Sequence, residues 1–453
     1  MKKNLSLKWP SKWDSPVFKS YRSLYVVTLV ACVVDYIGGF IDNAVGGRLL
    51  GEDVLSSLSV TGPVMLLLSL LGNLLTGGSI LASQELGAGN RETAKAYYRK
   101  TLMITIVEAI VTMAVVMLFS GQICRFLCGN SSAGVIENSV QYLIWFSPTA
   151  VPFLLMFVLT GFLRLDGAQD IPMKATIVLT VSDIALDFLL VPIWGIKGLA
   201  LATSISYTLG LLVYIFYFIR KDRLFKFSKG TSEKTGLGNI FFTGAPIAFN
   251  RFGNFVNAAF LNYLVFSLAS DAGGAIFNVR SQCMNITLAL LFGVIQAGVP
   301  ELGELYGAKA EDHMQEMKKL IIYSALTHGA ILALACILLR NQVLGIFGVD
   351  IKSEAFHGAG FALICLGIDV ILKAVISSVV IIYQVTGREK LSNVYSILET
   401  LFLLIPMELA FSLKFGIRGL WLGALASDII LVAIMCFNHF LHCKSQILKR
   451  SEQ

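Results

Sequence analysis

Two long apolar runs of the sequence each contain a pair of aspartates. Asp183 and Asp187 are four residues apart, so on a helix their carboxylates share one face. Two carboxylates at that spacing repel each other in apolar surroundings, and a proton or an oxygen-coordinated sodium ion would relieve the repulsion. Thr203, in the next apolar run, offers a hydroxyl to the same shell. The pattern predicts a site for H⁺ or Na⁺.

The other pair, Asp35 and Asp42, is seven residues apart, so both side chains fall on one stripe of a first helix. Their separation along the axis is roughly 10 Å, which is too far to share one ion on a straight helix. Gly38 and Gly39 lie between them, and a glycine pair is a site at which a helix can bend. A bend would change which carboxylate faces the other pair, so we expect a protonation-dependent switch here.

The second half of the chain carries its acids at other positions in apolar runs, namely Asp369, Glu399, Glu408 and Asp428. Asp369 and Lys373 are four residues apart and can neutralise each other, either as a structural ion pair or within a substrate site. Acids outnumber bases in the apolar runs by about nine to three, an excess that suits a cationic cargo or ion. We expect Asp369, Glu399, Glu408 and Arg251 to line the cavity for that cargo.

The elements that hold these residues follow from composition. Of the 453 residues, 56% are apolar and only 14% are charged, against roughly 25% charged in an ordinary soluble domain. This composition excludes a soluble enzyme or a nucleic-acid module. The eight cysteines lie scattered, with no pair or cluster at zinc spacing, and no cofactor is expected besides a coupling ion.

Apolar stretches of about 20 residues, each long enough to cross a bilayer as a helix, recur along the chain. They do not alternate as strands would, and an open sheet cannot satisfy its backbone in lipid. The sequence therefore predicts an all-α integral membrane protein with twelve transmembrane helices, at about 24–47, 57–83, 101–121, 138–162, 174–194, 198–219, 239–268, 274–299, 319–339, 355–384, 392–413 and 419–441.

Lysine and arginine predict the orientation of these spans. About 26 of them fall in segments on the side of the N-terminus and about seven on the opposite side, and basic loops stay cytoplasmic. We expect a multi-pass protein of a bacterial-type inner (plasma) membrane with both termini in the cytoplasm. The formal charge of +7 is then a topology signal and indicates no nucleic-acid partner.

A shift of about 220 residues brings the second half of the sequence onto the first. Gly167 falls on Gly387, GIKGLALA from Gly195 falls on GIRGLWLG from Gly416, and GSILASQELGAG falls on GVPELGELYGAK. Six spans separate the copies, so the repeat is parallel, and two six-helix bundles facing each other imply a central cavity and alternating access. The predicted organisation is an N-terminal tail (1–23), an N-lobe (24–219), a linker (220–238), a C-lobe (239–441) and a C-terminal tail (442–453).

The run FIDNAVGGRLLGEDVLSSLSVTGPVMLLLSLL, followed by GGSILASQELGAGNRETA, resembles the multidrug and toxic compound extrusion (MATE) family. The matching positions are Asp42, the glycines from Gly47 to Gly51, Pro63, and Gly77 through Ala94. Further matches are Asp183 to Asp187, Gly195 through Thr203, and the segments GAPIAF, IIYQVTGREKLS, LLIP and GIRGLW. The resemblance covers nearly the whole chain, and the second-span signature is its most specific part.

The resemblance implies a twelve-helix fold of two pseudo-symmetric bundles, in agreement with the repeat. It also implies that Asp42, with Asp183 and Asp187, takes up a proton or a sodium ion. Asp35 matches no family motif. Two positions depart from the family, because Asp183 stands where many members carry Asn and Glu399 where many carry a basic residue.

The sequence thus predicts a secondary antiporter, and not an enzyme, that exports amphipathic organic cations in exchange for H⁺ or Na⁺ by alternating access. We expect a monomer whose partners are small organic cations and the lipid bilayer. One alternative is a flippase for lipid-linked oligosaccharides from the same superfamily. Another is a major-facilitator-type carrier, although its usual basic loop motif is absent between spans two and three. No GxxxxGK[ST] motif supports ATP-driven transport.

Overall fold

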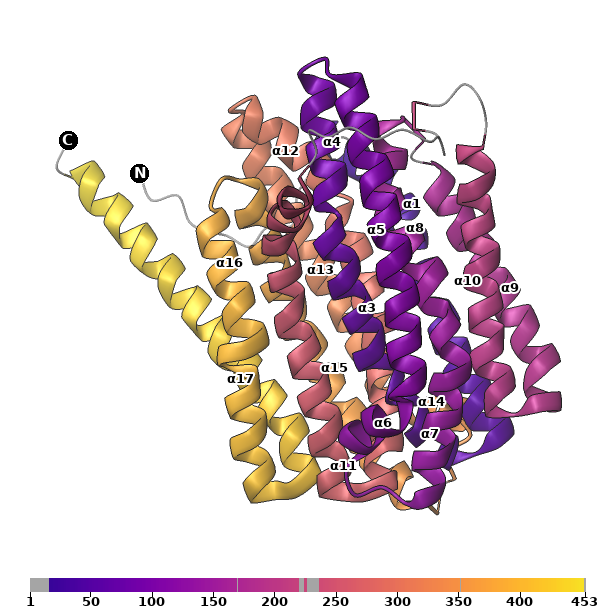
Figure 1. Cartoon of the computed structure of the whole chain (residues 1–453). Coiled ribbons are helices and arrows are strands. Elements are labelled where there is room, and N and C mark those ends of the chain that lie inside the picture. The colour runs from indigo at the N-terminus through magenta and orange to yellow at the C-terminus, as the bar shows by residue number, and fades with distance from the viewer. Residues whose placement is uncertain (1–15, 169, 220–223, 226–235, 351, 452–453) are drawn as a thin grey trace. The chain divides into compact units, whose positions relative to one another are not determined.

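A computed structural model describes residues 16–168, 170–219, 224–225, 236–350 and 352–451, and in some helical stretches only the backbone. Most of the predicted linker and the first 15 residues of the predicted N-terminal tail lie outside the described residues. All regular structure within the described ranges is helical (Figure 1). The prediction of an all-α membrane protein is therefore confirmed.

The first half of the chain, up to residue 219, forms ten α-helices and one 3₁₀ turn. These are α1 (Pro16–Leu50), α2 (Glu52–Leu58), α3 (Thr61–Leu75), α4 (Gly77–Gly87), α5 (Arg91–Leu118), α6 (Ser120–Cys128), α7 (Ala133–Phe146), η1 (Ser147–Thr149), α8 (Ala150–Leu165), α9 (Asp170–Trp194) and α10 (Ile196–Phe218).

The second half forms fewer but longer helices. These are α11 (Leu237–Gln296), α12 (Val299–Gly307), α13 (Glu311–Leu338), α14 (Arg340–Ile346), α15 (Glu354–Val385), α16 (Glu389–Ile397), the π-helical segment η2 (Leu398–Phe402) and α17 (Leu404–Ser451). Two of them contain a break in the backbone, α11 at Ala269 and Ser270 and α17 at Gly416.

Nine helical segments of the described residues are long and apolar enough to cross a membrane. They are Glu52–Leu86, Arg91–Leu118, Ala133–Leu165, Asp170–Trp194, Ile196–Phe218, Phe252–Gln296, Glu311–Leu338, His357–Val385 and Lys390–Asn438. The two longest contain the breaks in α11 and α17, so each accommodates two crossings, and α1 is a further helix of 35 residues. Counted in this way, the helices agree with the twelve predicted spans.

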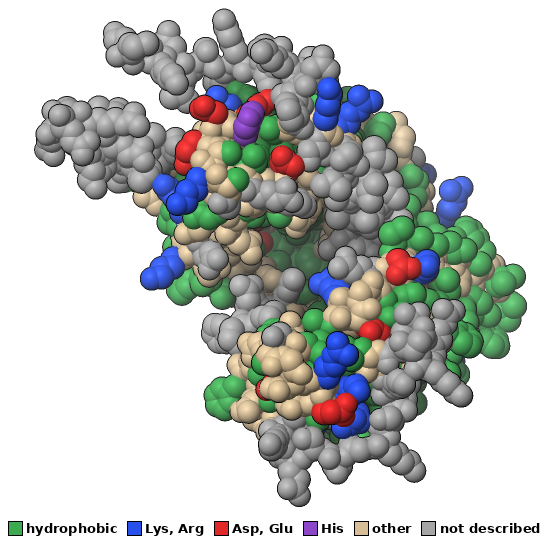
Figure 2. Space-filling view, turned by 90° about the horizontal axis from the view of Figure 1, so that it is seen from above, with side chains coloured by type: hydrophobic (Ala, Val, Ile, Leu, Met, Phe, Trp, Pro, Cys, Tyr) green, Lys and Arg blue, Asp and Glu red, His purple; other side chains and the backbone are tan. Residues whose placement is uncertain are grey.

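The outward sides of these helices are apolar, as a lipid environment requires. On α5 the exposed side chains include Met103, Val107, Ile110 and Leu118, which recur at helical spacing along one face. In Figure 2, lysine, arginine, aspartate and glutamate side chains are scattered over the face seen from above, and hydrophobic side chains gather at its right-hand margin.

The backbone repeats with the period found in the sequence. Ten described residues have a positive φ, and they form five pairs at offsets of 219 to 221 residues: 51 and 270, 89 and 309, 129 and 348, 167 and 387, and 195 and 416. Eight of the ten are glycines, the residue that adopts this conformation without strain, and the other two are Ser270 and Lys309. The helix-ending turns therefore recur in both halves, which supports the predicted repeat.

By internal packing the chain forms two compact units. Unit 1 comprises residues 1–36, 283–341 and 360–453, and unit 2 comprises residues 37–282 and 342–359. The predicted lobes, 24–219 and 239–441, follow the sequence repeat and remain predictions.

Each unit has its own apolar core. In unit 2 the rings of Tyr98, Phe162, Phe218 and Phe225 pack together with centroids 5.0 to 5.6 Å apart. In unit 1 the beginning of α1 packs on α11, α12 and α13 through a cluster that includes Tyr21. These cores hold in place the helices that carry the buried acids.

Candidate cation site

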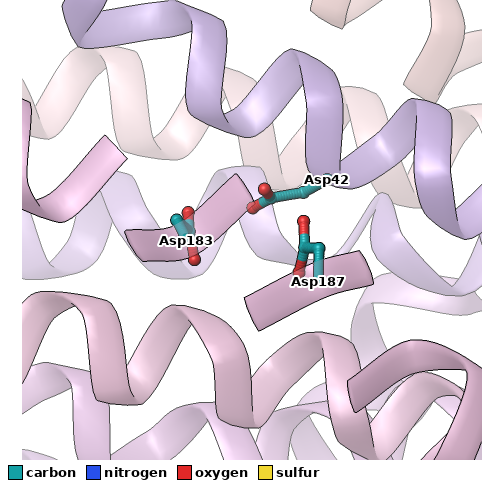
Figure 3. A group of neighbouring side chains, drawn as sticks. All are labelled: Asp42, Asp183 and Asp187. Atoms are coloured by element: carbon teal, nitrogen blue, oxygen red, sulfur yellow. The ribbon is translucent and has the colours of Figure 1, made fainter. Parts of the chain in front are cut away.

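Three aspartates of unit 2 converge inside the protein (Figure 3). Asp42 comes from α1, and Asp183 and Asp187 come from one face of α9, where they lie one helical turn apart. One carboxylate oxygen of each lies within 4.8 Å of those of the other two. The side chains are buried, with 8%, 3% and 0% of their surface exposed. We call this group the aspartate cluster.

Helices α1 and α9 lie close together next to the aspartate cluster. A Cβ atom at Gly38 would lie 3.7 Å from the Asp183 carboxylate and 3.9 Å from the methyl group of Thr180, both ordinary van der Waals distances. The backbone stays helical through Gly38 and Gly39, and a bend at these two glycines stays a prediction.

The aspartate cluster is short of hydrogen-bond donors. Asp42 Oδ1, Asp183 Oδ1 and both carboxylate oxygens of Asp187 accept no hydrogen bond from any described residue. None of the three acids is ion-paired with a described lysine, arginine or histidine. Buried carboxylates without a base are stable only if they take up a proton or a cation. Their oxygens are the ligands of a hard cation.

Other polar side chains surround the aspartate cluster, and the sequence reasoning did not find them. The ring of Tyr142 on α7 is buried, and the charges of all three aspartates act on its hydroxyl. Ser206 on α10 lies within hydrogen-bonding reach of Asp183. One signal was available, because Ser206 is three residues after Thr203 and so lies on a neighbouring part of the same helix face.

The two remaining residues predicted for the ion site, Thr203 and Asp35, are not observed as part of the aspartate cluster. The Thr203 hydroxyl donates a hydrogen bond to the Leu199 carbonyl 3.3 Å away, within its own helix. The coordination by Thr203 therefore stays a prediction. Asp35 lies on α1, but its side chain is outside the described residues, as is the side chain of Arg251 on α11. The structure therefore brings together three of the five residues predicted for the ion site.

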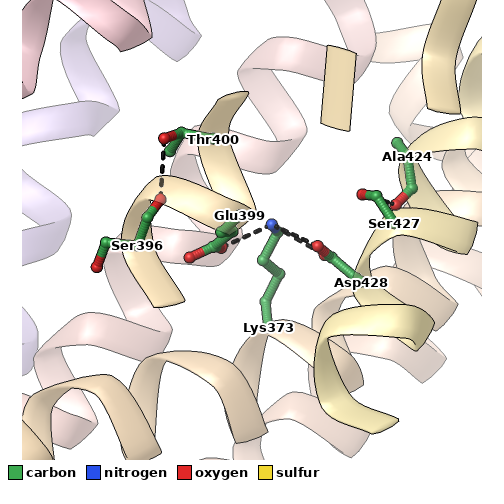
Figure 4. Close-up of polar contacts among 7 residues, drawn as sticks. All are labelled: Lys373, Ser396, Glu399, Thr400, Ala424, Ser427 and Asp428. Carbon is green, nitrogen blue, oxygen red and sulfur yellow. Dashed lines mark hydrogen bonds and ion pairs between the residues drawn. The ribbon is translucent and has the colours of Figure 1, made fainter. Parts of the chain in front are cut away.

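A second group of ionisable side chains lies in unit 1 (Figure 4). The Lys373 ammonium on α15 is 2.8 Å from Glu399 Oε1 on η2 and 2.9 Å from Asp428 Oδ2 on α17. Asp369 is one turn before Lys373 on α15, and its charge acts on both Lys373 and Asp428. We call these four residues the lysine cluster.

The lysine cluster only partly matches the sequence prediction. The spacing suggested that Asp369 and Lys373 can neutralise each other, and the charge of Asp369 does act on Lys373. The sequence spacing did not suggest Glu399 and Asp428, acids from two other helical segments that form ion pairs with Lys373. Glu408 is buried on α17 with 3% of its surface exposed. A role for Asp369, Glu399 and Glu408 in a substrate cavity stays a prediction.

Comparison with known proteins is consistent with this arrangement. The MatE family model matches residues 28–189, the part of the chain that carries all three acids of the aspartate cluster. The chain is 26% identical to the probable multidrug resistance protein YoeA of Bacillus subtilis, over 97% of this chain and 96% of that protein. It is 24% identical to the multidrug export protein MepA of Staphylococcus aureus, over 94% of each.

Solved structures share the fold. The inward-facing structure of a multidrug resistance MATE family transporter of the MOP superfamily superposes with a TM-score of 0.81 at 18% identity, over 93% of this chain and 98% of that one. An outward-facing structure of a MATE transporter gives a TM-score of 0.68 at 19% identity, over 96% and 97%. The chain is thus similar to MATE family proteins by sequence over residues 28–189, and it shares the fold of MATE transporters over nearly its whole length.

Proposed function

We propose that this chain is a MATE family transporter, a secondary antiporter that exports amphipathic organic cations in exchange for H⁺ or Na⁺. The MatE match over residues 28–189 and the shared fold argue against the major-facilitator alternative. The relatives named above are multidrug resistance and multidrug export proteins, which supports drug-like cargo. The basic segments on the side of the N-terminus support a plasma-membrane protein with both termini in the cytoplasm.

The observation that carries this proposal is the aspartate cluster. Three buried carboxylates within 4.8 Å of one another, with no described base paired to them, form a site for one small cation or for protons. A central point between three oxygens within that separation lies at most about 2.8 Å from each, close to the 2.3–2.6 Å typical of hard-cation sites. The spacing of the three carboxylates therefore suits one small cation.

The position of the aspartate cluster on two helices suggests how ion uptake is coupled to transport. Asp42 belongs to α1, and Asp183 and Asp187 belong to α9. Without a cation, the three carboxylates repel each other and favour a state in which α1 and α9 separate. With a proton or Na⁺ bound, the repulsion is relieved and the helices close. Antiport requires that the ion and the cargo stabilise different conformational states.

The test uses purified full-length protein in proteoliposomes, with tetraphenylphosphonium, a lipophilic organic cation, as the transported probe. An inward sodium gradient, an inward proton gradient and no gradient are imposed in turn. We expect at least one gradient to drive export of the probe against its own concentration gradient, and this gradient identifies the coupling ion. Export driven by neither ion would contradict the proposal.

The cargo class has its own control. The control probe is a soluble derivative of tetraphenylmethane, a neutral molecule of similar shape. If the cargo must be cationic, this probe should not be exported against its concentration gradient. Equal export of charged and neutral probes would contradict the cationic cargo but leave ion coupling intact. We further propose that the transporter works as a monomer, which light scattering of the purified protein would check.

A further inference from the structure

The lysine cluster of unit 1 is an acid group that already contains a cation. The Lys373 ammonium lies within 3.2 Å of one oxygen of Asp428, 2.9 Å of the other, and 2.8 Å of Glu399. Only 15% of the Lys373 side chain is exposed, against 20% for Glu399 and 2% for Asp428. The ammonium thus sits where a free cation would bind these carboxylates.

The lysine cluster contains more acids than bases. Three carboxylates, those of Asp369, Glu399 and Asp428, and one ammonium make up the cluster. Asp369 lies within hydrogen-bonding reach of Asp428, so these two acids can share a proton. The lysine cluster therefore holds one fixed positive charge and a capacity for protons.

One acid of the lysine cluster, Glu399, lies in an irregular part of the backbone. Glu399 lies in η2, a π-helical segment of five residues between α16 and α17. Such segments are rare, appear as local bulges and occur frequently at functional sites. The wider helical turn brings Glu399 to Lys373, a residue 26 positions earlier in the sequence.

The internal repeat shows that the lysine cluster is not a copy of the aspartate cluster. At an offset of 220, Lys373 falls on Phe153, and at an offset of 221, Asp428 falls on Tyr207. The rings of Phe153 and Tyr207 pack against each other with centroids 5.8 Å apart. One half of the repeat thus has an aromatic contact where the other half has an ion pair.

We propose that Lys373 is a specificity-determining residue, a tethered cation that fills the acid group of unit 1 and confines exchangeable inorganic cations to the aspartate cluster. A second unit charge about 4 Å from the ammonium is disfavoured by roughly a thousandfold at an effective dielectric constant of about 20. Sodium is therefore kept out of unit 1, although three carboxylates lie there. The placement of the exchangeable ion at the aspartate cluster rests on the proposed function. The exclusion of sodium from the lysine cluster does not depend on it.

The experiment measures equilibrium binding of ²²Na⁺ to purified full-length protein at alkaline pH. All variants carry Asp42→Asn, which weakens ion binding at the aspartate cluster. In this background we expect no high-affinity sodium site when Lys373 is present and one such site per chain after Lys373→Met. Adding Glu399→Gln to Lys373→Met should weaken the new site by more than tenfold, because it removes one of its carboxylates.

Two matched variants test whether the gain is specific. Lys373→Arg keeps a fixed positive charge and should create no sodium site. Lys174→Met removes a lysine that is paired with Asp170 at 2.6 Å on the exposed part of α9, and it should also create none. A sodium site gained in either of these controls would overturn the proposal, as would the absence of a site in Lys373→Met.

A second readout does not depend on counting ions. A new site stabilises the folded protein as sodium rises, because the ion binds only the folded state. The unfolding temperature of Lys373→Met should therefore rise when sodium chloride replaces choline chloride at equal ionic strength, while that of Lys373→Arg should not. If the transporter uses only protons, the chain without substitutions binds no sodium, but Lys373→Met still gains its sodium site. The proposal about Lys373 and the proposal of sodium coupling can therefore be refuted independently.

Discussion

Replacing Asp42 by asparagine tests the aspartate cluster most directly. The substitution keeps the size of the side chain and an oxygen ligand but removes one of three negative charges. Two unit charges 4.8 Å apart repel by about 3.5 kcal/mol at an effective dielectric constant of about 20. Full ionisation of the empty cluster would involve three such pairs, so the cluster favours a bound proton or cation.

The expected magnitude follows from the same geometry. One carboxylate about 2.8 Å from a central cation attracts it by about 6 kcal/mol at that dielectric constant. The asparagine oxygen still coordinates the ion and retains part of this attraction. We therefore expect Asp42→Asn to weaken ion binding by about 2–3 kcal/mol, which corresponds to roughly 30- to 150-fold.

The assay is export of tetraphenylphosphonium from proteoliposomes at increasing concentrations of the driving ion. In Asp42→Asn the ion concentration for half-maximal export should rise by the stated factor, and at a fixed gradient the initial rate should fall at least tenfold. Asp53→Asn is the matched control, since Asp53 is exposed in the first turn of α2 and the same chemical change there should leave export unaltered. Undiminished ion-driven export in Asp42→Asn would refute the assignment of the ion to this cluster.

Three further predictions concern helix packing, a hydrogen bond between Tyr217 and Asp166, and competition between protons and sodium. A Cβ at Gly47 would lie 2.1 Å from the Phe347 carbonyl oxygen, so Gly47→Ala should lower the unfolding temperature by an amount equivalent to about 1–3 kcal/mol. The control is Gly62→Ala, which should not lower it, because a Cβ at Gly62 meets no atom within 4 Å. Equal unfolding temperatures of the two variants would contradict the close packing at Gly47. Tyr217→Phe removes the hydroxyl that donates to Asp166 at 2.8 Å and should cost about 1.5 kcal/mol in a denaturant titration; an unchanged midpoint would show that the bond contributes nothing. Protons compete with Na⁺ for the same carboxylates, so the apparent sodium affinity should be lower at acidic than at alkaline pH, and a pH-independent affinity would argue against a carboxylate site.

The sequence predicted the elements well because each prediction depended on local chemistry. A bilayer requires about 20 apolar residues per crossing whatever the neighbouring helices do, so the spans could be read one at a time. The repeat could be found because a turn with positive φ favours glycine, and the pairs at 167 and 387 and at 195 and 416 are conformationally matched in the structure.

The partners of the buried acids were harder to predict. Asp183 and Asp187 lie on one helix, so their proximity follows from spacing alone. Lys373, by contrast, has an i−4 neighbour in Asp369 but forms its ion pairs with Glu399 and Asp428, 26 and 55 residues later. Spacing within one helix could not reveal this, because helix packing and the π-helical segment bring those side chains together.

By itself, then, the sequence determined that the chain is a helical membrane protein with an internal repeat and acids within its spans, because hydropathy, helical spacing and glycine turns are local properties. The tertiary structure placed Asp42 within 4.8 Å of the pair on α9, as the family resemblance implied. Only the tertiary structure decided that Ser206 is the hydroxyl beside Asp183 and that Glu399 and Asp428 pair with a lysine in unit 1. These contacts depend on which faces of separate helices meet, and that is decided by packing over the whole molecule. Buried acids consequently form a group without a described base in one unit and a group that contains a lysine in the other.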